Sequence, residues 1–377
     1  MKKIKCLLLL SLAFLMLNVN AQEKLFNFKD AIYFNSKILP KRIKNLQWLE
    51  KGAEYSFIKD STLMLASAAN ESPAKKLLSL QSLNGFLAEN NLTLEHFPNI
   101  HWESNTEFTF QNNNRLFNVN IKDKKSSLLN LWPDSAQNSE VEPLTKRVAY
   151  TIENNLYIAD NQKQIQLTDD PENVVNGQTV SRSEFGITDG IFWSPKGNYL
   201  AYYHKDERMV GDYPIVDITS PEATVKNIKY PMAGSTNELI KVAVYDVKTK
   251  KTIYLKTGED IDQYLTNITW SPDEKQIYIS VLNRDQNHLK LNKYDALSGE
   301  FLLTLFEEKA DTWVEPEHPL TFLRNRNDQF IWFSERDGWQ HLFVYNTEGQ
   351  FVKQLTKGEW TVTSLLGFDN SGKNLII

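Results

Sequence analysis

The sequence predicts an all-β protein, a β-propeller of antiparallel four-stranded blades, and three observations lead to this fold class. Aromatic residues, which favour strands, make up 12% of the chain. Short segments of alternating apolar and polar residues recur, separated by turns rich in Asn, Asp and Gly. One unit also repeats, in which an aromatic residue ends a strand, a turn follows, and an alternating strand begins. Its copies start at Trp48, Trp193, Trp270 and Phe368, at separations near multiples of the ~40 to 50 residues of a propeller blade.

The blades can be followed in order along the chain. Strand pairs are expected at residues 48–57, 108–121, 147–159, 192–202, 270–279, 330–345 and 368–377. The clearest is the hairpin at residues 192–202, where a Trp-Ser-Pro turn separates two apolar strands. Trp339 and Trp360 are expected in the core between blades. Ser72 and Pro73, followed by apolar residues at helical spacing, predict a short helix that interrupts the first blade.

Composition and charge exclude several kinds of partner. The chain is 41% hydrophobic and 24% charged, which is typical of a soluble globular protein. A net charge of −5 without a long basic run excludes nucleic acid as an expected partner. The chain has no paired-histidine motif and no cysteine cluster, and its acidic group Glu259, Asp260 and Asp262 falls on a predicted turn. We therefore expect no metal and no other cofactor.

Residues 1–21 have the pattern of an export signal. Three lysines precede an apolar run over residues 6–17, and Ala21 ends a small-residue cleavage site. The alternative is a membrane anchor, but the run is shorter than the ~20 residues of a spanning helix. The one cysteine, Cys6, lies in this signal, so we expect no disulfide. The prediction is export to a bacterial periplasm or cell surface, with no membrane span after cleavage.

Short sequence pieces follow one another in a characteristic order. They are Asn176-Gly177, Glu184-Phe185-Gly186, Trp193-Ser194-Pro195, and residues 229–234, 334–342 and 355–362. This ordered set resembles the propeller domain of the dipeptidyl peptidase IV family of serine peptidases, within the prolyl oligopeptidase superfamily. The resemblance covers residues 145–377 well and residues 40–145 in outline.

The resemblance implies a domain organisation. After a connecting arm at residues 22–40, residues 41–377 are expected to form part of an eight-bladed propeller, with about seven blades begun. The family carries its Ser-Asp-His triad on a C-terminal α/β-hydrolase domain, and this chain contains no Gly-x-Ser-x-Gly motif. We therefore expect the chain to be a fragment that lacks its hydrolase domain and has no catalytic residues of its own. Whether the chain is part of an active enzyme stays open, because the resembled family is a serine-type dipeptidyl peptidase and this chain lacks the Ser-Asp-His triad.

Glu184 is the main candidate for a binding residue. In the resembled family, two adjacent glutamates on a short propeller helix hold the free amino terminus of the peptide substrate. An α-ammonium with a pKa of ~7.7 to 8.0 needs an opposite charge when it enters a partly dry cavity. Glu184 matches one of these glutamates, and Ser183 stands where the second acid is expected. The predicted substrate-binding residues are Glu184, Ser183 and Arg182; the alternative is a solvated turn in which Glu184 pairs with Arg182.

Two functions stay open at this point. The chain is either the propeller of an exported dipeptidyl peptidase, which gates the cavity and binds the substrate's amino terminus, or a periplasmic propeller that binds or scaffolds without catalysis. The missing triad and Ser183 favour the second. The charged run at residues 204–208 follows a strand where a loop could contact a second subunit. A homodimer is therefore among the partners that the resemblance implies, beside the peptide substrate and the missing hydrolase domain.

Overall fold

The structure, a computed structural model, describes residues 27–33, 40, 42–49, 53–258, 262–324, 326–369 and 371–377. The predicted export signal, most of the predicted arm, and Glu259 and Asp260 lie outside the described residues. The chain divides into two units, Met1–Gln81 and Ser82–Ile377. In the described residues, no helix is long and apolar enough to cross a membrane.

The first unit contains a four-stranded antiparallel sheet. A short helix, α2 (Phe28–Tyr33), precedes β1 (Lys44–Trp48), β2 (Glu54–Lys59), β3 (Thr62–Ser67) and β4 (Lys75–Ser79), which pair in that order. The predicted helix is confirmed as α3 (Leu80–Leu87), but it begins later than predicted. Residues 75–79 instead pair with β3, because the sheet edge satisfies their backbone groups as a helix would.

The second unit begins with two four-stranded sheets. The first follows a short helical turn, η1 (Ala88–Asn90), and contains β5 (His101–Trp102), β6 (Glu107–Asn112), β7 (Arg115–Asn120) and β8 (Lys125–Leu131). The second contains β9 (Gln137–Val141), β10 (Val148–Ile152), β11 (Asn155–Asp160) and β12 (Lys163–Gln166). In both, consecutive strands pair antiparallel, as a propeller blade requires.

The later sheets continue this series. The third contains β13 (Val174–Asn176), β14 (Ile191–Trp193), β15 (Tyr199–Asp206), β18 (Leu239–Asp246) and β19 (Lys251–Tyr254). The fourth contains β20 (Gln263–Trp270), β21 (Gln276–Asn283), β22 (His288–Asp295) and β23 (Phe301–Lys309). The fifth contains β24 (Thr321–Leu323), β25 (Arg326–Ser334), β26 (His341–Asn346) and β27 (Phe351–Gln354), and the short pair β28 (Gly367–Phe368) and β29 (Leu375–Ile376) follows.

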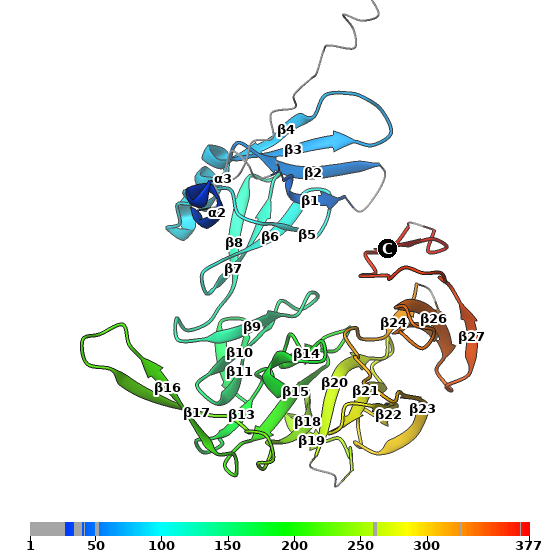
Figure 1. Ribbon diagram of the computed structural model, residues 1–377. Coiled ribbons are helices and arrows are strands. Elements are labelled where there is room, and N and C mark those ends of the chain that lie inside the picture. The colour runs from blue at the N-terminus through cyan, green and yellow to red at the C-terminus, as the bar shows by residue number, and fades with distance from the viewer. Residues whose placement is uncertain are drawn as a thin grey trace, which may run out of the picture. The chain divides into compact units, whose positions relative to one another are not determined.

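Neighbouring sheets of the second unit pack face to face and share hydrophobic cores. One core joins β10 and β11 to β15 and β18, and includes Leu156 and Leu200. The next joins β15 and β18 to β20 and β21, and a third joins the β20–β23 sheet to β25 and β26 around Trp332. The blades therefore follow one another in sequence order (Figure 1), which confirms the predicted propeller architecture. The prediction for Trp339 and Trp360 is wrong, because these side chains are 43% and 44% exposed on connections outside the strands.

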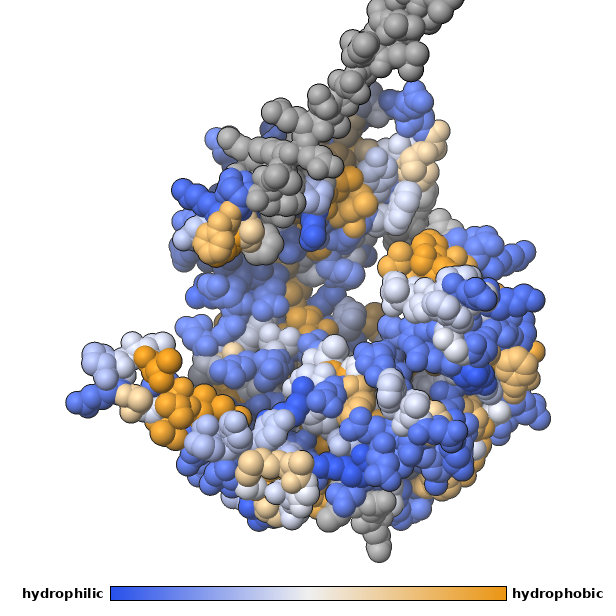
Figure 2. Space-filling model, viewed as in Figure 1, coloured by the Kyte–Doolittle hydropathy of each residue, from blue (hydrophilic) through white to orange (hydrophobic). Residues whose placement is uncertain are grey.

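A hairpin projects from the third sheet between β15 and β18. Its strands, β16 (Asp212–Asp217) and β17 (Thr224–Lys229), pair only with each other. Several large apolar side chains on and beside it are exposed: Tyr213, Ile215, Val216, Ile218, Val225, Tyr230 and Met232. Figure 2 shows hydrophobic surface on this hairpin. Burial of such exposed apolar side chains against another surface is favourable, and contiguous patches of them are typical of interaction sites.

A buried glutamate ties the turn of one blade to the next blade. The Glu274 carboxylate, only 4% exposed, accepts hydrogen bonds from the Ser194 hydroxyl (2.6 Å), the Lys196 backbone N–H (2.6 Å) and the Asn198 amide (2.7 Å). These donors lie on the Trp-Ser-Pro turn of the preceding blade. Glu274 therefore fixes the third and fourth sheets to each other beside their shared core.

Candidate functional site

The predicted site residues lie on a loop inserted into the first strand of the third sheet. That strand is interrupted: β13 and β14 both pair with β15, and residues 177–190 leave the sheet between them. The loop departs and returns at one residue, because Tyr203 accepts a hydrogen bond from the Gly177 N–H (2.9 Å) and donates its own N–H to the Gly190 carbonyl (3.0 Å). The sheet thus holds both ends of the loop that carries Glu184.

The loop has an unusual backbone conformation. Ser181, Arg182 and Ser183 have φ values of 49°, 56° and 61°, so the turn η2 (Ser181–Ser183) is left-handed. Phe185 follows at 58°, with Glu184 extended between them. Each non-glycine residue in this region costs about 1–2 kcal/mol. Backbone strain of this kind persists only where surrounding contacts impose it, and it is concentrated at functional sites.

Buried contacts hold the strained loop in place. The Glu238 carboxylate, 4% exposed, accepts a hydrogen bond from the Ser181 N–H at 2.8 Å. The Thr266 hydroxyl donates to the Phe185 carbonyl at 2.5 Å, and the Phe185 ring packs 4.6 Å from the Tyr264 ring. These contacts fix the residues on both sides of Glu184, whose own side chain is exposed.

Glu184 lines a cavity of about 530 Å³ between this loop and a second segment, residues 313–317. The lining residues are Ser183, Glu184, Phe185, Gly186, Thr188, Gln286, Trp313, Glu315 and Glu317. The two walls touch, since a Cβ atom on Gly186 would lie 2.3 Å from the Glu317 carbonyl oxygen. Gly186 also has a φ of 71°, so both the close approach and the backbone conformation require glycine.

The cavity is acidic. Glu184, Glu315 and Glu317 contribute three carboxylates, and none of the residues that line the cavity is basic. In the part of the chain that the structure describes, the Glu184 carboxylate forms no hydrogen bond and no ion pair. Walls of one charge sign attract ligands of the opposite sign. The arrangement therefore suits a small cationic group such as an ammonium.

The three predicted site residues have different surroundings. Glu184 and Ser183 line the cavity, whereas Arg182 is not among the lining residues. The Arg182 guanidinium donates to the Lys229 carbonyl and lies 4.8 Å from the centre of the Tyr230 ring. Among the described residues no ion pair joins Glu184 to Arg182, although Glu184 is exposed, as the alternative of a solvated turn expects.

Sequence reasoning missed the second wall of the cavity. Residues 313–317, Trp-Val-Glu-Pro-Glu, connect β23 to β24 and lie far from Glu184 in the chain. The sequence pattern that could have indicated this wall is a proline flanked by two acidic residues in a connection between blades. In the described residues, no group of three or more His, Cys, Asp or Glu is arranged to hold a metal ion.

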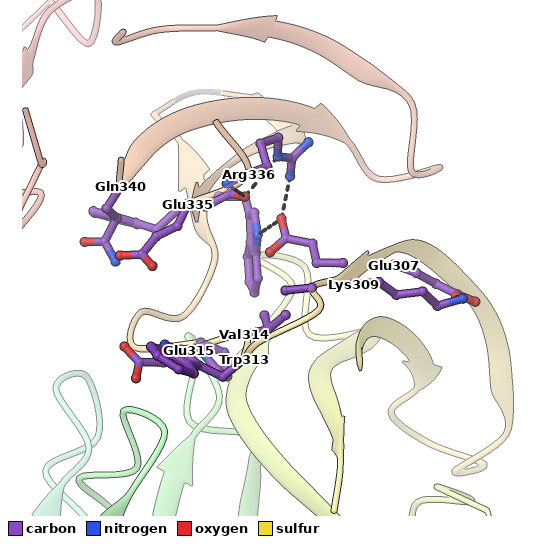
Figure 3. Close-up of a pocket in the computed structure, with 14 residues that line it drawn as sticks. Glu307, Lys309, Trp313, Val314, Glu315, Glu335, Arg336 and Gln340 are labelled. Carbon is purple, nitrogen blue, oxygen red and sulfur yellow. Dashed lines mark hydrogen bonds and ion pairs between the residues drawn. The ribbon is translucent and has the colours of Figure 1, made fainter. Parts of the chain in front are cut away.

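A second cavity, of about 290 Å³, adjoins the first. It shares Trp313 and Glu315 with the acidic cavity, and Figure 3 shows these residues opposite Glu335, Arg336 and Gln340. Here Glu308 pairs with the Arg336 guanidinium at 2.5 Å and accepts the Trp332 indole N–H at 3.0 Å. Burial lowers the pKa of Arg336, but hydrogen bonding to Tyr345 and the Glu308 charge outweigh it and hold this pKa above its usual value. The charge of Arg336 is thus already matched within the protein.

Comparison with known proteins decides the family. Residues 95–376 match the family model described as the dipeptidyl peptidase IV (DPP IV) N-terminal region. The chain belongs to this family. Within this DPP IV N-terminal region lie all the sheets of the second unit and both walls of the acidic cavity.

Two solved structures and a curated sequence are similar to this chain. A Bacteroides ovatus protein assigned as a dipeptidyl aminopeptidase IV is 38% identical, with a TM-score of 0.81 over 89% of this chain. Dipeptidyl peptidase 4 of Porphyromonas gingivalis shares the fold, with a TM-score of 0.71 at 20% identity over 93% of this chain. Dipeptidyl peptidase 4 of Trichophyton rubrum is 26% identical over 66% of this chain. The matches span 50%, 52% and 35% of those proteins, so the chain spans about half their length or less.

Proposed function

We propose that this chain is the N-terminal propeller part of an exported dipeptidyl peptidase-like serine peptidase, and that its inserted loop binds the free amino terminus of peptide substrates. One observation carries the proposal. Glu184 sits on a strained, tightly held loop at an acidic cavity, and its carboxylate forms no hydrogen bond or ion pair in the described residues. An unblocked peptide amine supplies the opposite charge that this cavity lacks.

The proposal includes a domain organisation. Residues 1–21 would be the export signal, residues 22–40 a connecting arm and residues 41–377 the propeller, with an α/β-hydrolase domain that carries the catalytic triad elsewhere in the longer protein. Membership of the family's N-terminal region and the partial coverage of the relatives support it. In this arrangement the propeller gates access to the catalytic residues, and the bound amine fixes how many residues precede the cut bond.

The proposed chemistry depends on charged hydrogen bonds. An α-ammonium has three donors, and each hydrogen bond to a charged group contributes about 1.5–3 kcal/mol. Glu184 would accept one of these bonds, the Ser183 hydroxyl lies beside it, and Glu315 and Glu317 face it from the other wall. An acetylated amine has neither the charge nor the three donors, so the site would discriminate against it.

A second candidate is a periplasmic propeller that binds or scaffolds without catalysis. One observation favours it: Ser183 stands where the family's second acid is expected, which weakens the amine site. In that case peptide binding would occur without hydrolysis.

Hydrolysis assays separate the two candidates. The full-length gene product and residues 22–377 alone are each incubated with Xaa-Pro and Xaa-Ala chromogenic substrates. We expect turnover only from the full-length product, and a Gly-x-Ser-x-Gly motif encoded after codon 377. A full-length product that has no such motif, binds peptides and releases no chromophore would favour the binding module.

We also propose that the β16–β17 hairpin contacts a second copy of the chain. Val216 and Val225 are directly paired across the hairpin and are 56% and 61% exposed. Replacing them by a Lys and Glu pair (Val216→Lys with Val225→Glu) keeps a favourable cross-strand contact but removes the apolar surface. In sedimentation analysis, the unmodified protein should be a dimer and the double variant a monomer. The control is Leu144→Lys, which puts a charge on another exposed apolar residue, 66% exposed and outside the hairpin, and should leave the dimer intact. A monomeric unmodified protein, or a dimer that survives the double change, would contradict this contact.

A further inference from the structure

Strand β20 contains an irregularity beside the acidic cavity. Thr266 pairs with Ser280 and Thr269 pairs with Tyr278, so β20 has one more residue than β21 over this interval. The extra residue forms a β-bulge, and Asn267 within it has a φ of 57°. Asparagine tolerates this left-handed conformation better than most residues. Bulges of this kind redirect side chains and are frequent next to functional sites.

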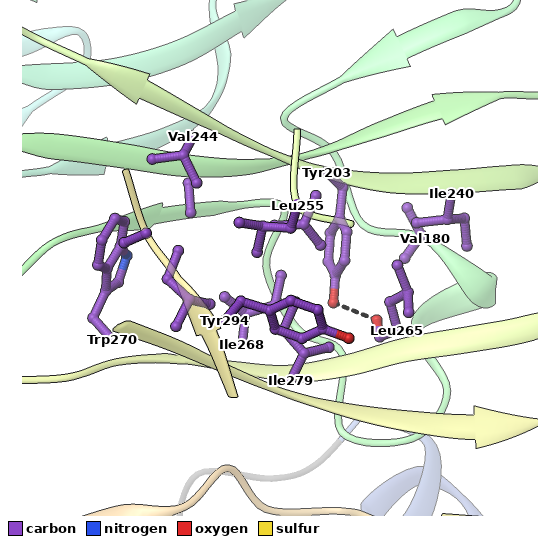
Figure 4. Close-up of a cluster of buried hydrophobic side chains, with 14 of the residues drawn as sticks. Val180, Tyr203, Ile240, Val244, Leu255, Leu265, Ile268, Trp270, Ile279 and Tyr294 are labelled. Carbon is purple, nitrogen blue, oxygen red and sulfur yellow. Dashed lines mark hydrogen bonds between the residues drawn. The ribbon is translucent and has the colours of Figure 1, made fainter. Parts of the chain in front are cut away.

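Three consecutive residues at this bulge bond three different parts of the site. The Leu265 carbonyl accepts the Tyr203 hydroxyl at 2.7 Å (Figure 4), and Tyr203 is the residue at which the inserted loop leaves and returns. The Thr266 hydroxyl donates to the Phe185 carbonyl, in the wall that carries Glu184. The Asn267 amide donates to the Pro316 carbonyl at 2.9 Å, in the wall that carries Glu315 and Glu317.

A regular strand could not make the last two bonds in the same way. Successive side chains of a strand point to opposite faces, so Thr266 and Asn267 would diverge. The bulge instead lets both side chains serve the two walls of one cavity. Both are buried, Thr266 at 0% and Asn267 at 6% exposed, so each bond is shielded from competing water.

We propose that Asn267 is a positioning residue of the amine site, which sets the distance between Glu184 and the carboxylates of the second wall. The inference rests on the proposed function. Its physical basis is that the three N–H donors of an ammonium point in fixed directions relative to one another. Carboxylates on both walls can therefore accept hydrogen bonds from one ammonium only when the walls are the right distance apart. Pro316 lies between Glu315 and Glu317 in the chain. The hydrogen bond from the Asn267 amide to the Pro316 carbonyl therefore holds the wall that carries both carboxylates.

The test compares two substitutions at Asn267. Asn267→Gly keeps the left-handed backbone and removes the amide, while Asn267→Asp keeps the side-chain shape and replaces the donor by an acceptor that repels the Pro316 carbonyl. In the full-length gene product, calorimetry measures the dissociation constants of Ala-Pro amide and of N-acetyl-Ala-Pro amide. We expect affinity for the free amine to fall about tenfold in both variants, the equivalent of one hydrogen bond, with the acetylated ligand unaffected. Where the product hydrolyses Xaa-Pro substrates, KM should rise by the same factor with kcat unchanged.

Matched controls make the result specific. Asn113→Gly makes the same change at an exposed turn residue with a φ of 49°, and should leave both affinities unchanged. Thermal melting of each variant identifies any that fails to fold, and the other Asn267 variant then decides the test. Free-amine affinity equal to that of the unmodified protein in a folded Asn267 variant overturns the positioning role. If Glu184→Gln also leaves this affinity unchanged, the proposed function itself fails and the inference fails with it.

Discussion

Glu274→Ala should lower the free energy of unfolding by about 2–4 kcal/mol, because it leaves three donors on the neighbouring blade, among them the buried Ser194 hydroxyl, without their acceptor. The donors are the Ser194 hydroxyl, the Lys196 N–H and the Asn198 amide. Urea denaturation at neutral pH measures the change. Glu172→Ala, at an exposed loop residue, should change stability by less than about 0.5 kcal/mol. Equal stability of the two variants would mean that Glu274 does not lock the blades together.

The contribution of Glu274 should also depend on pH. Burial raises the pKa of this carboxyl, but the hydrogen bonds from Ser194, Asn198 and the Lys196 N–H outweigh burial and hold the pKa below its usual value. The folded pKa is thus lower than the unfolded value of ~4.3, so the stabilisation is fully present above pH ~4.3 and is lost as pH falls through the folded pKa. The stability difference between the unmodified protein and Glu274→Gln should therefore shrink as the pH is lowered below about 4. A difference that stays constant from neutral pH down to acid would exclude a stabilising charge at this position.

Glu184→Gln should reduce kcat/KM for substrates with a free amino terminus by about 1.5–3 kcal/mol, or roughly 10- to 150-fold. Glutamine keeps the size of the side chain and removes the negative charge that the ammonium requires. Because Glu184 is exposed, water screens part of its interaction, and the lower half of this range is expected. The assay is hydrolysis of Xaa-Pro chromogenic substrates by the full-length gene product.

The acetylated form of each substrate is the internal control for Glu184. Hydrolysis of the acetylated substrate should be slow and should not change in Glu184→Gln. Blocking the amine and removing the charge disrupt the same contact, so the two losses in kcat/KM should not add. Glu172→Gln removes a charge elsewhere on the surface and should leave both substrates unaffected. A Glu184→Gln enzyme that still prefers the free amine as strongly as the unmodified enzyme would rule out the proposed role.

Local patterns account for the parts of the fold that the sequence predicted. Strand alternation and the Trp193-Ser194-Pro195 turn are short-range signals, and they located the blades correctly. The pairing of residues 75–79 with β3 depends on a separate strand, and because of it the helix begins only at Leu80. Trp339 and Trp360 were misplaced because aromatic character alone does not show whether a residue lies in a strand or on an exposed connection.

The candidate site was predicted only where the family resemblance reached it. Glu184 and Ser183 were identified in this way, whereas Glu315, Glu317 and Asn267 join the site through the packing of separate blades. No local pattern indicates the left-handed turn at Ser181–Ser183 either, because serine and arginine ordinarily avoid that conformation. Buried contacts from Glu238 and Thr266 impose it.

The most direct test of amine recognition is a crystal structure of the full-length gene product with Ala-Pro amide bound. We expect the ligand's ammonium nitrogen in the cavity between the inserted loop and residues 313–317, within hydrogen-bonding distance of the Glu184 carboxylate. An ammonium bound elsewhere, with Glu184 in contact with solvent alone, would contradict it.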